Sequence, residues 1–546
     1  MRLVDLLLGE TKTSLRRLAM LAAVAGASNA GLLAVINSAA ERFKDGHPRL
    51  THVALYLIFI FAYIYAQRYV LLTTSGEIER LVHRFRQRLV ERLMGCELRD
   101  VEQIGHGRIF ASISSDTRII SQTANALVMG AQSALLIVFA SIYLATISMT
   151  ALVLCCIFMA IAVRIYQSKM KGVGIALHQA AKEENLLHDL ANGLLDGFKE
   201  VKLSSQRAAA LMAHVVEVSQ RTADYRTAGQ LALGVTMIFA QVAFFLLLGT
   251  LVFLTPLFGK AYSGAIMASM TTVMFLIGPL SMLMATVPQI AVADAAAENL
   301  LSLEKLLAAS ADAGARAGGV PSAPAPLPGP LQTLALRELF FSHVSGDSRF
   351  DVGPINLTIH AGETIFVTGG NGSGKSTLIK LITGLYAPLS GQLLINNVPT
   401  AAAGAQALRD RYCAVFSDFH LFRQFYGIPM PDPLVASAWL ERMEIADKTE
   451  IAVDGYSTVD LSTGQRKRLA LISALLEDKP IIVLDEWAAD QDPHFRRKFY
   501  DELLPLMKAA GKTVIAVTHD DRYFHLADRH LHMEEGTMRE IKQGSP

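Results

Sequence analysis

The sequence has little of what marks several common classes of protein. Its 4 Cys among 546 residues are too few for a disulfide-stapled secreted scaffold. Gly (39) and Pro (19) are at ordinary levels and hydrophobic residues make up 52%, which excludes a disordered or fibrous chain. Lys and Arg (50) nearly cancel Asp and Glu (49), so net charge gives no reason to expect a nucleic acid partner.

Charged residues are also scarce, at 18%, and they are distributed unevenly. Long apolar runs fill residues 1–309, whereas residues 331–546 read as a soluble α/β domain. The segment 310–330 between them is rich in Pro, Ala and Gly, and its prolines remove backbone donors and fix φ. We expect an apolar domain over 1–309, a linker without helix over 310–330 and an α/β domain over 331–546. A structured loop is the alternative for the linker.

Six apolar stretches reach or approach the length of a membrane span. A bilayer core about 30 Å thick requires about 20 apolar residues in a helix. The candidates are 18–40, 52–74, 125–146, 148–167, 230–254 and 264–288. A cleaved signal peptide is the alternative for the first, because Arg16 and Arg17 precede it, but its apolar pattern continues through residues 32–36. Buried helices of a soluble protein are the alternative for all six.

Basic residues predict which side of the membrane is inside. The long connections between the second and third spans and between the fourth and fifth spans are rich in Lys and Arg, whereas the opposite side has only Arg42, Lys44, Arg49 and Lys260. We therefore expect both long connections and both chain ends to be cytoplasmic. Residues 77–94 carry apolar residues at helical spacing among charges, so we expect the spans to continue as helices beyond the membrane.

A phosphate-binding loop follows the short β-rich run 364–368. The loop fits GxxxxGK[ST] between a strand and a helix, and consists of Gly369, Gly370, Asn371, Gly372, Ser373, Gly374, Lys375, Ser376 and Thr377. Its glycines let backbone N–H groups face phosphate oxygens, and the next helix adds the positive end of its dipole. We expect ATP to bind here, with Lys375 on the β- and γ-phosphates and Ser376 on Mg²⁺.

Two further strand ends carry groups suited to hydrolysis. The run 480–485 (PIIVLD) is a buried-strand pattern that ends in Asp485, with Glu486 next. We expect Asp485 to hold Mg²⁺ and Glu486 to polarise the attacking water or act as general base. The run 513–518 (TVIAVT) ends at His519, which could reach a γ-phosphate. The alternative for His519 is a surface residue at a strand end.

The segment 461–466 (LSTGQR) resembles the LSGGQ signature of ABC transporters, and it lies just ahead of the Asp485 strand as in that family. The resemblance implies that Ser462, Gly464 and Gln465 bind the nucleotide held by a partner's phosphate loop, so that two copies enclose two ATP molecules. The segment 490–493 resembles the family's D-loop, with Asp492 at the matching Asp, and His519 matches the switch histidine.

Three positions depart from the family pattern. Ser417 stands where the Q-loop glutamine is usual, so Asp418 or water is expected to take its place at the metal. Thr463 replaces a signature glycine. The aromatic residue that stacks on adenine aligns best with His343, with Phe341 as the alternative.

The order of six spans and one nucleotide domain resembles an exporter-type half-transporter. This implies a membrane α-helical bundle followed by an α/β P-loop domain, and an ATP hydrolase coupled to transport. The segments 197–203 and 416–418 resemble the branch that exports cyclic peptides and siderophore precursors, including pyoverdine, syringomycin and microcin exporters. We therefore expect a homodimer in the inner membrane that exports a small peptide or siderophore precursor by alternating access. The alternatives are a lipid or multidrug exporter and an ATP-binding regulatory or channel-like protein.

Overall fold

The structure is a computed structural model that describes residues 15–42, 50–254, 263–317, 329–345, 348–400, 404–452 and 454–541. Contacts divide the chain into two compact units. The helical unit consists of Met1–Arg88 and Phe110–Ser302. The mixed unit consists of Leu89–Ile109 and Leu303–Pro546, so it takes in the tip of the first long hairpin as well as the C-terminal half.

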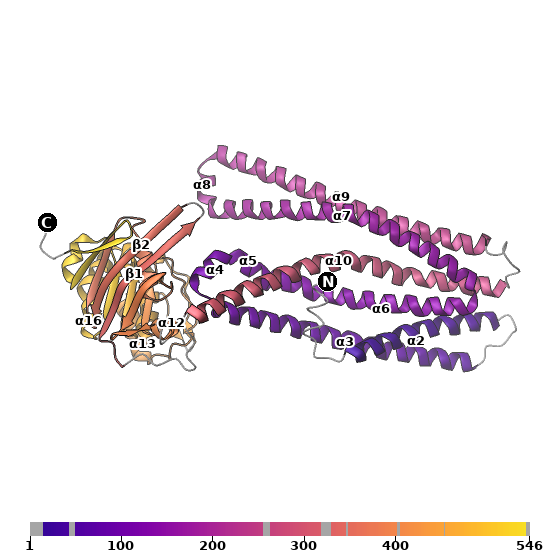
Figure 1. Cartoon of the computed structure of the whole chain (residues 1–546), viewed down its shortest axis with the longest axis horizontal. Coiled ribbons are helices and arrows are strands. Elements are labelled where there is room, and N and C mark those ends of the chain that lie inside the picture. Colours follow the sequence, from indigo (N-terminus) through magenta and orange to yellow (C-terminus); the bar gives the residue numbers. More distant parts are fainter. Residues whose placement is uncertain are drawn as a thin grey trace. The chain divides into compact units, whose positions relative to one another are not determined.

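Long helices make up nearly all of the first unit (Figure 1). They are α2 (Leu15–Arg42), α3 (Leu50–Met94), α6 (Thr117–Ile147), α7 (Met149–Asp196), α9 (Ser205–Gly249) and α10 (Ser263–Ala317). Shorter helices are α4 (Leu98–Ile104), α5 (His106–Ala111) and α8 (Phe198–Lys202), and π-helical turns cover Ser112–Asp116 and Thr250–Leu254.

Among the described residues, six helices are long and apolar enough to cross a membrane, which confirms the six predicted spans. Their candidate segments are Met20–Ala40, Leu50–Met94, His106–Ile147, Met149–Asp196, Ser205–Phe253 and Ile266–Ser310. The helices α3, α7 and α9 extend well beyond the apolar stretches predicted as spans. For α3, the helical spacing of residues 77–94 predicted this extension. Helices suit a membrane because all their backbone groups bond within the segment.

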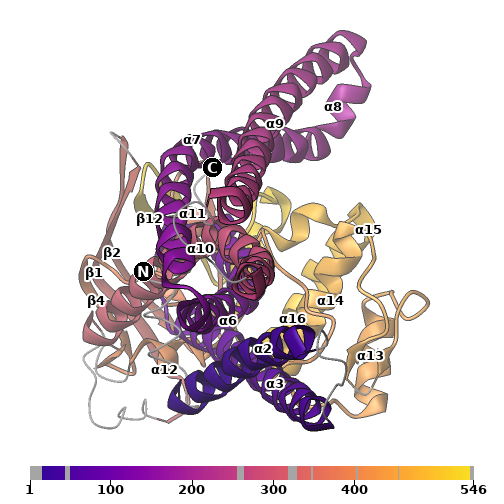
Figure 2. The ribbon, with the colours of Figure 1, turned by 90° about the vertical axis from the view of Figure 1, so that its right-hand side faces the viewer.

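A single residue reverses the chain between α6 and α7. Ser148 is extended, with φ −156° and ψ 116°, and its side chain accepts a hydrogen bond from the N–H of Ala151. This cap satisfies one of the free donors at the start of α7. At the other end of α7, α8 connects it to α9, and α7 and α9 lie side by side (Figures 1 and 2).

Two contacts fix α10 against its neighbours in the helical unit. A Cβ on Gly130 of α6 would lie only 2.9 Å from the side chain of Thr286, so glycine allows these helices to approach closely. Pro288 has no N–H, so the carbonyl of Met284, four residues earlier, lacks its usual helical donor. The hydroxyl of Tyr166 from α7 donates to that carbonyl at 2.7 Å.

The predicted start of the linker at residue 310 was wrong, because α10 continues to Ala317. Residues 310–317 are the last eight of α10, although we expected no helix from residue 310 onward. The physical reason is that this stretch contains Ala and Arg but no Pro, and the first linker proline is Pro321. The proline-rich part, 318–328, lies outside the described residues.

The mixed unit contains two main sheets and a short hairpin. One sheet has the order β2-β1-β4-β5, and the larger has the order β12-β11-β3-β10-β9-β6. The strands are β1 (Thr333–Ser345), β2 (Ser348–His360), β3 (Thr364–Gly369), β4 (Ser390–Ile395), β5 (Val398–Pro399), β6 (Tyr412–Val415), β7 (Ile451–Ala452), β8 (Gly455–Tyr456), β9 (Ile481–Asp485), β10 (Thr513–Val517), β11 (Arg529–Glu534) and β12 (Thr537–Ile541). The helices are α11 (Lys375–Ile382), α12 (Ala405–Arg409), α13 (Pro433–Arg442), α14 (Thr463–Leu476), α15 (Pro493–Lys498) and α16 (Leu504–Ala509).

The central strands are buried on both faces, which explains their unbroken apolar runs. In β9, Ile481 and Val483 pack with α11 and the β1–β2 sheet, whereas Ile482 and Leu484 pack with residues of α14 and α16. This alternation follows from the two-residue period of a strand. The expected α/β domain is therefore built around a parallel sheet covered on both sides.

The bond between Tyr166 and Met284 gives a testable consequence. Tyr166→Phe keeps the ring but leaves the Met284 carbonyl without this donor, so we expect a loss of about 1 kcal/mol in stability of the helical unit. Thermal unfolding of the full chain in detergent measures it. Tyr65→Phe, at a side chain that is 71% exposed, is the control and should change nothing. Equal melting temperatures for both variants would contradict the assignment.

Candidate active site

The parallel register of three strands brings the predicted catalytic segments to one edge of the sheet. Val517 of β10 is paired with Val367 of β3 on one side and with Asp485 of β9 on the other. The phosphate loop, Glu486 and His519 each follow the end of one of these strands. Because the strands are parallel, the three segments emerge from the same edge. Ser417 follows β6, which pairs with the other side of β9.

Three of the four glycines of the phosphate loop are required by the backbone. Gly369, Gly372 and Gly374 have φ of 143°, 77° and 101°, values that favour glycine. A Cβ on Gly369 would lie 2.2 Å from the carbonyl oxygen of Met533 in β11. The loop predicted from the GxxxxGK[ST] pattern therefore has the expected strand–loop–helix context.

Lys375 is the first residue of α11 and is almost fully buried beneath the loop. Its ammonium donates to the carbonyls of Gly369 and Gly370, both at 2.9 Å, so it braces the loop from inside. Ser373 is also buried, and its hydroxyl has no partner within the described residues. Asn371, Gly372 and Ser376 are exposed and Thr377 is partly buried, which leaves this face of the loop open to a ligand.

Asp485 is 3% exposed, and the hydroxyl of Ser417 donates to its Oδ2 at 3.1 Å. Burial raises the pKa of Asp485, and the bond from Ser417 acts against this rise. The sequence did not predict this bond. It showed only that Ser417 stands where a Q-loop glutamine is usual. Asp418, the residue we expected at the metal, is exposed and adjacent to Ser417.

The oxygens at this edge suit a hard cation. Within the described residues there is no cluster of three or more His, Cys, Asp or Glu that could hold a metal. Mg²⁺ in nucleotide sites needs only one or two carboxylates, because phosphate and water oxygens complete its shell. Asp485, with a hydroxyl beside it, fits that requirement. Asp485 and Ser376 would hold the ion, and Mg²⁺ when bound would neutralise phosphate charge.

Glu486 and His519 lie together at the ends of β9 and β10. His519 Nε2 is 3.5 Å from Glu486 Oε1, and both side chains are accessible. The N–H of Glu486 donates to the carbonyl of Val517, which joins the two strand ends. Glu486 adopts a left-handed conformation, with φ 50° and ψ 34°, which is uncommon outside glycine. Such backbone outliers are concentrated at functional sites.

The signature segment opens α14 with a capping box. The hydroxyl of Ser462 accepts from the N–H of Gln465, and the Gln465 side chain accepts from the N–H of Ser462. Ser462 is exposed at the N-cap, where the helix dipole favours a phosphate. A Cβ on Gly464 would lie 2.8 Å from the carbonyl oxygen of Asp490, so this position also needs a glycine. The binding of a partner's nucleotide by Ser462, Gly464 and Gln465 stays a prediction.

Asp492 has two partners in the structure. It caps α15 by accepting from the N–H of Phe495 at 2.9 Å, and it accepts from Arg468 of α14 at 2.7 Å. The bond from Phe495 and the charge of Arg468 lower the pKa of Asp492. Asp492 therefore ties the D-loop to the signature helix.

His343 lies edge-on to Phe341 and to Tyr386, with ring centroids 5.0 and 5.6 Å apart. Burial and the nearby charges of Arg99 and Lys380 lower its pKa, which favours a neutral ring. Its place against adenine stays a prediction. Phe350 pairs with His343 across the β1–β2 ladder, and its ring reaches within 3.5 Å of a Cβ built on Gly374. The sequence alone did not reveal Phe350, because its pairing with His343 depends on the register of the β1–β2 ladder.

Comparisons with known proteins agree with this geometry. Residues 352–489 match the family model described as ABC transporter. The chain is similar to the ATP-binding protein SyrD of Pseudomonas syringae pv. syringae, with 34% identity over 480 residues that cover 84% of this chain and 82% of that protein. It is also similar to an ATP-dependent lipid A-core flippase of Burkholderia orbicola (strain AU 1054), with 33% identity over 38% of this chain and 37% of that one.

The fold has a close counterpart among solved structures. A bacterial Atm1-family ABC exporter with ATP bound superposes with a TM-score of 0.75 over 95% of this chain and 94% of that chain. Sequence identity is 19%, so this match concerns the fold. It supports the order of six membrane helices followed by a nucleotide-binding domain.

The contact between Ser417 and Asp485 can be tested by titrating Mg²⁺ into an ATPase assay. Ser417→Ala removes the donor to a buried carboxylate that we expect at the metal. Loss of a group that orients a metal ligand typically weakens metal binding by about tenfold or more, so the Mg²⁺ concentration for half-maximal activity should rise by that factor. Ser437→Ala, on the exposed face of α13, is the control. An unchanged Mg²⁺ requirement would rule out the role of Ser417.

Proposed function

Because the chain belongs to the ABC transporter family, we propose that it works as a homodimer that exports a cyclic or nonribosomal peptide, or a siderophore precursor, across the inner membrane. The chain is an exporter of this family that binds and hydrolyses ATP, and it is a multi-pass membrane protein. The proposal concerns the cargo, the pairing of two copies, the use of Mg²⁺ and the orientation in the membrane.

The observation that carries the ATP-driven step of the proposed export is the shared edge of the parallel sheet. The phosphate loop, Asp485, Glu486 and His519 meet there, with Glu486 and His519 in contact. A carboxylate beside a phosphate site can orient or deprotonate the attacking water, and a histidine can donate to the γ-phosphate. The chain therefore has the groups that ATP hydrolysis requires at one place.

The tip of the first long hairpin provides a route from the ATP site to the spans. This tip, α4, belongs to the same compact unit as the nucleotide-binding domain. Glu102 accepts from Lys380 of α11 at 3.0 Å and from Tyr386 at 2.6 Å, and Glu97 pairs with Arg409. Partial burial raises the pKa of Glu102, but the bonds from Tyr386 and Lys380 outweigh it and lower the pKa. The hairpin would therefore follow any movement of α11.

The second long hairpin supports the pairing of two copies. Its tip exposes Leu195, Phe198 and Leu203 by 72%, 49% and 89%. In the proposed orientation this tip lies in the cytoplasm, where lipid would not cover it. Apolar side chains gathered on a water-exposed tip are typical of a docking surface. We assign its partner as the nucleotide-binding domain of the second copy.

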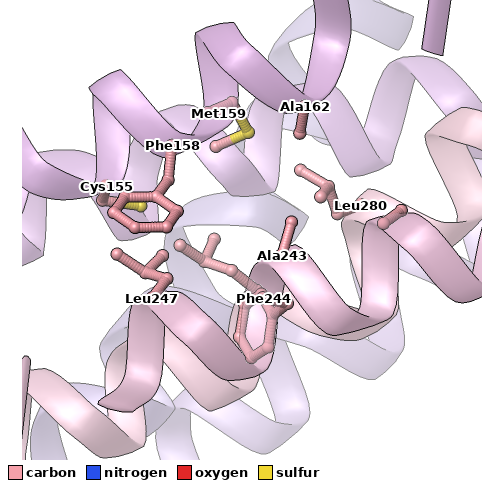
Figure 3. A pocket seen from close by; sticks show the side chains of 10 residues that line it. Cys155, Phe158, Met159, Ala162, Ala243, Phe244, Leu247 and Leu280 are labelled. Carbon is pink, nitrogen blue, oxygen red and sulfur yellow. The ribbon is translucent and has the colours of Figure 1, made fainter. Parts of the chain in front are cut away.

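A pocket in the helical unit is too small for a peptide cargo. It is lined only by apolar residues and one Cys, from α7, α9 and α10, including Cys155, Phe158, Phe244 and Leu280 (Figure 3). Its volume is about 30 Å³. Sites for drug-sized ligands measure about 300–1,000 Å³, so a peptide does not fit there. A cavity between two copies would supply the space.

The peptide cargo is favoured by the resemblance of residues 197–203 and 416–418 to the peptide and siderophore branch. The similarity to SyrD spans most of both chains, whereas that to the lipid A-core flippase spans little more than a third of either. The longer match includes residues of both the helical and the nucleotide-binding parts. Lipid is therefore the second candidate.

Transport by inside-out vesicles tests the proposal. We expect Mg²⁺–ATP to drive uptake of a labelled cyclic lipopeptide by wild type, and Glu486→Gln to reduce ATP turnover about a hundredfold or more, because a general base contributes that much. Glu502→Gln, at an exposed carboxylate away from the strand ends, is the control.

The outcomes separate the alternatives. Uptake of a labelled lipid instead of the peptide would favour a lipid exporter. Equally negligible ATP turnover by wild type and Glu486→Gln would refute pumping and favour a regulatory or channel-like protein.

A further inference from the structure

Lys467 is a charged residue in an unusual place. It lies in α14, five residues after the signature serine, and its side chain is 2% exposed. Lysine is almost never fully buried without a partner, because removing its charge from water is costly. A buried lysine that the phosphate loop does not use therefore calls for a specific function.

The ammonium of Lys467 reaches the segment that follows β9. It donates to the backbone carbonyl of Glu486 at 2.9 Å and pairs with Asp490 Oδ2 at 2.8 Å. The indole N–H of Trp487, next to Glu486, donates back to the carbonyl of Lys467 at 2.8 Å. Lys467 and the segment 486–490 are thus joined by bonds in both directions.

The bond to Glu486 falls on its backbone outlier. With φ 50° and ψ 34°, this residue is held in a conformation that is unfavourable for a non-glycine residue and therefore needs support from its surroundings. The carbonyl of Glu486 accepts from Lys467 and, at 3.3 Å, from the N–H of Ala489. Together with the bond from the Glu486 N–H to the carbonyl of Val517, fixing the carbonyl holds the backbone and therefore the direction of the Cα–Cβ bond from which the carboxylate extends.

We propose that Lys467 is a positioning residue for ATP hydrolysis: it holds the Glu486 backbone so that the carboxylate lies beside His519 at the phosphate edge of the sheet. This inference rests on the proposed role of Glu486 in hydrolysis. Lys467 touches neither His519 nor the phosphate loop among the contacts described, so its effect passes through Glu486.

The position of Lys467 in α14 extends this role to the pair of sites. The start of α14 is the signature segment, which we assign to the ATP of the second copy. Lys467, Arg468 and Gln491 connect the same helix to the segment 486–492, with Gln491 donating to Gly464 at 3.1 Å. A shift of α14 when its N-terminus meets a phosphate would therefore be transmitted to Glu486 of its own chain.

Lys467→Met tests the inference, because it keeps the length of the apolar stem and removes the ammonium. We expect kcat of the full-length protein in proteoliposomes to fall about a hundredfold, the effect that a displacement of about 1 Å can have. KM for ATP should stay unchanged, because the phosphate loop is untouched. Lys508→Met is the control and should keep wild-type kcat. It removes a lysine paired at 2.6 Å with Asp528, which accepts from the N–H of Thr364 at the end of β3 opposite to the phosphate loop.

A double variant separates positioning from a general structural effect. In a Glu486→Gln background, single-turnover hydrolysis should not fall further when Lys467→Met is added, because the two residues act as one unit. A similar fold-loss in both backgrounds would overturn the inference.

A second variant covers the case in which Lys467→Met does not fold. Asp490 is about half exposed, so Asp490→Lys adds a like charge beside Lys467 without altering the core. We expect its kcat to be lower than that of Asp490→Asn, with the same KM; equal kcat values would overturn the inference. Wild-type kcat in Lys467→Met, alongside an active wild type and an inactive Glu486→Gln, would refute this inference and leave the proposed function standing.

Discussion

The parallel pairing of β3, β10 and β9 is the constraint on which the site depends. Each strand alone ends in a short polar segment, and pairing in register makes those segments neighbours. Asp485 is held at its strand end by burial and by Ser417, and Glu486 is tied to the end of β10 through Val517. The apolar runs on both faces of the sheet bury those strands, so packing in the core determines the geometry of the site.

Around that edge, charged side chains connect elements that must move together. Glu102 joins the first hairpin to α11, Arg468 joins α14 to the D-loop, and Lys467 joins α14 to Glu486. Each contact pairs a residue of one element with a residue distant in sequence. In the helical unit, where every backbone group needs a partner, Tyr166 does the same for the carbonyl that Pro288 leaves free. The chain thus couples its elements by a few specific polar contacts within apolar packing.

Much of this architecture could be predicted from the sequence, and the exceptions have physical reasons. The six helices, the phosphate loop, Asp485 and Glu486 belong to local patterns of hydropathy, glycine spacing and strand ends, which sequence records directly. The helix continues through Ala317 because the prolines of 310–330 begin only at Pro321. It was missed because the composition of the whole segment was taken to apply to its first residues. The bond from Ser417 to Asp485, the opposition of Phe350 and His343, and the burial of Lys467 depend on the pairing of distant segments. A local sequence pattern does not specify which distant segments pair, or in which register their strands align.

Two copies are proposed to complete each other's ATP sites, with the phosphate loop from one and the signature from the other. The most direct measurement mixes two inactive forms with different affinity tags, Lys375→Ala in one and Ser462→Arg in the other, and assays doubly purified dimers for ATP hydrolysis. Hydrolysis should return in the mixed dimer, because one of its two sites then contains an intact loop and an intact signature. A mixed dimer as inactive as either parent would contradict this proposal, since the loop and the signature would then have to come from the same chain.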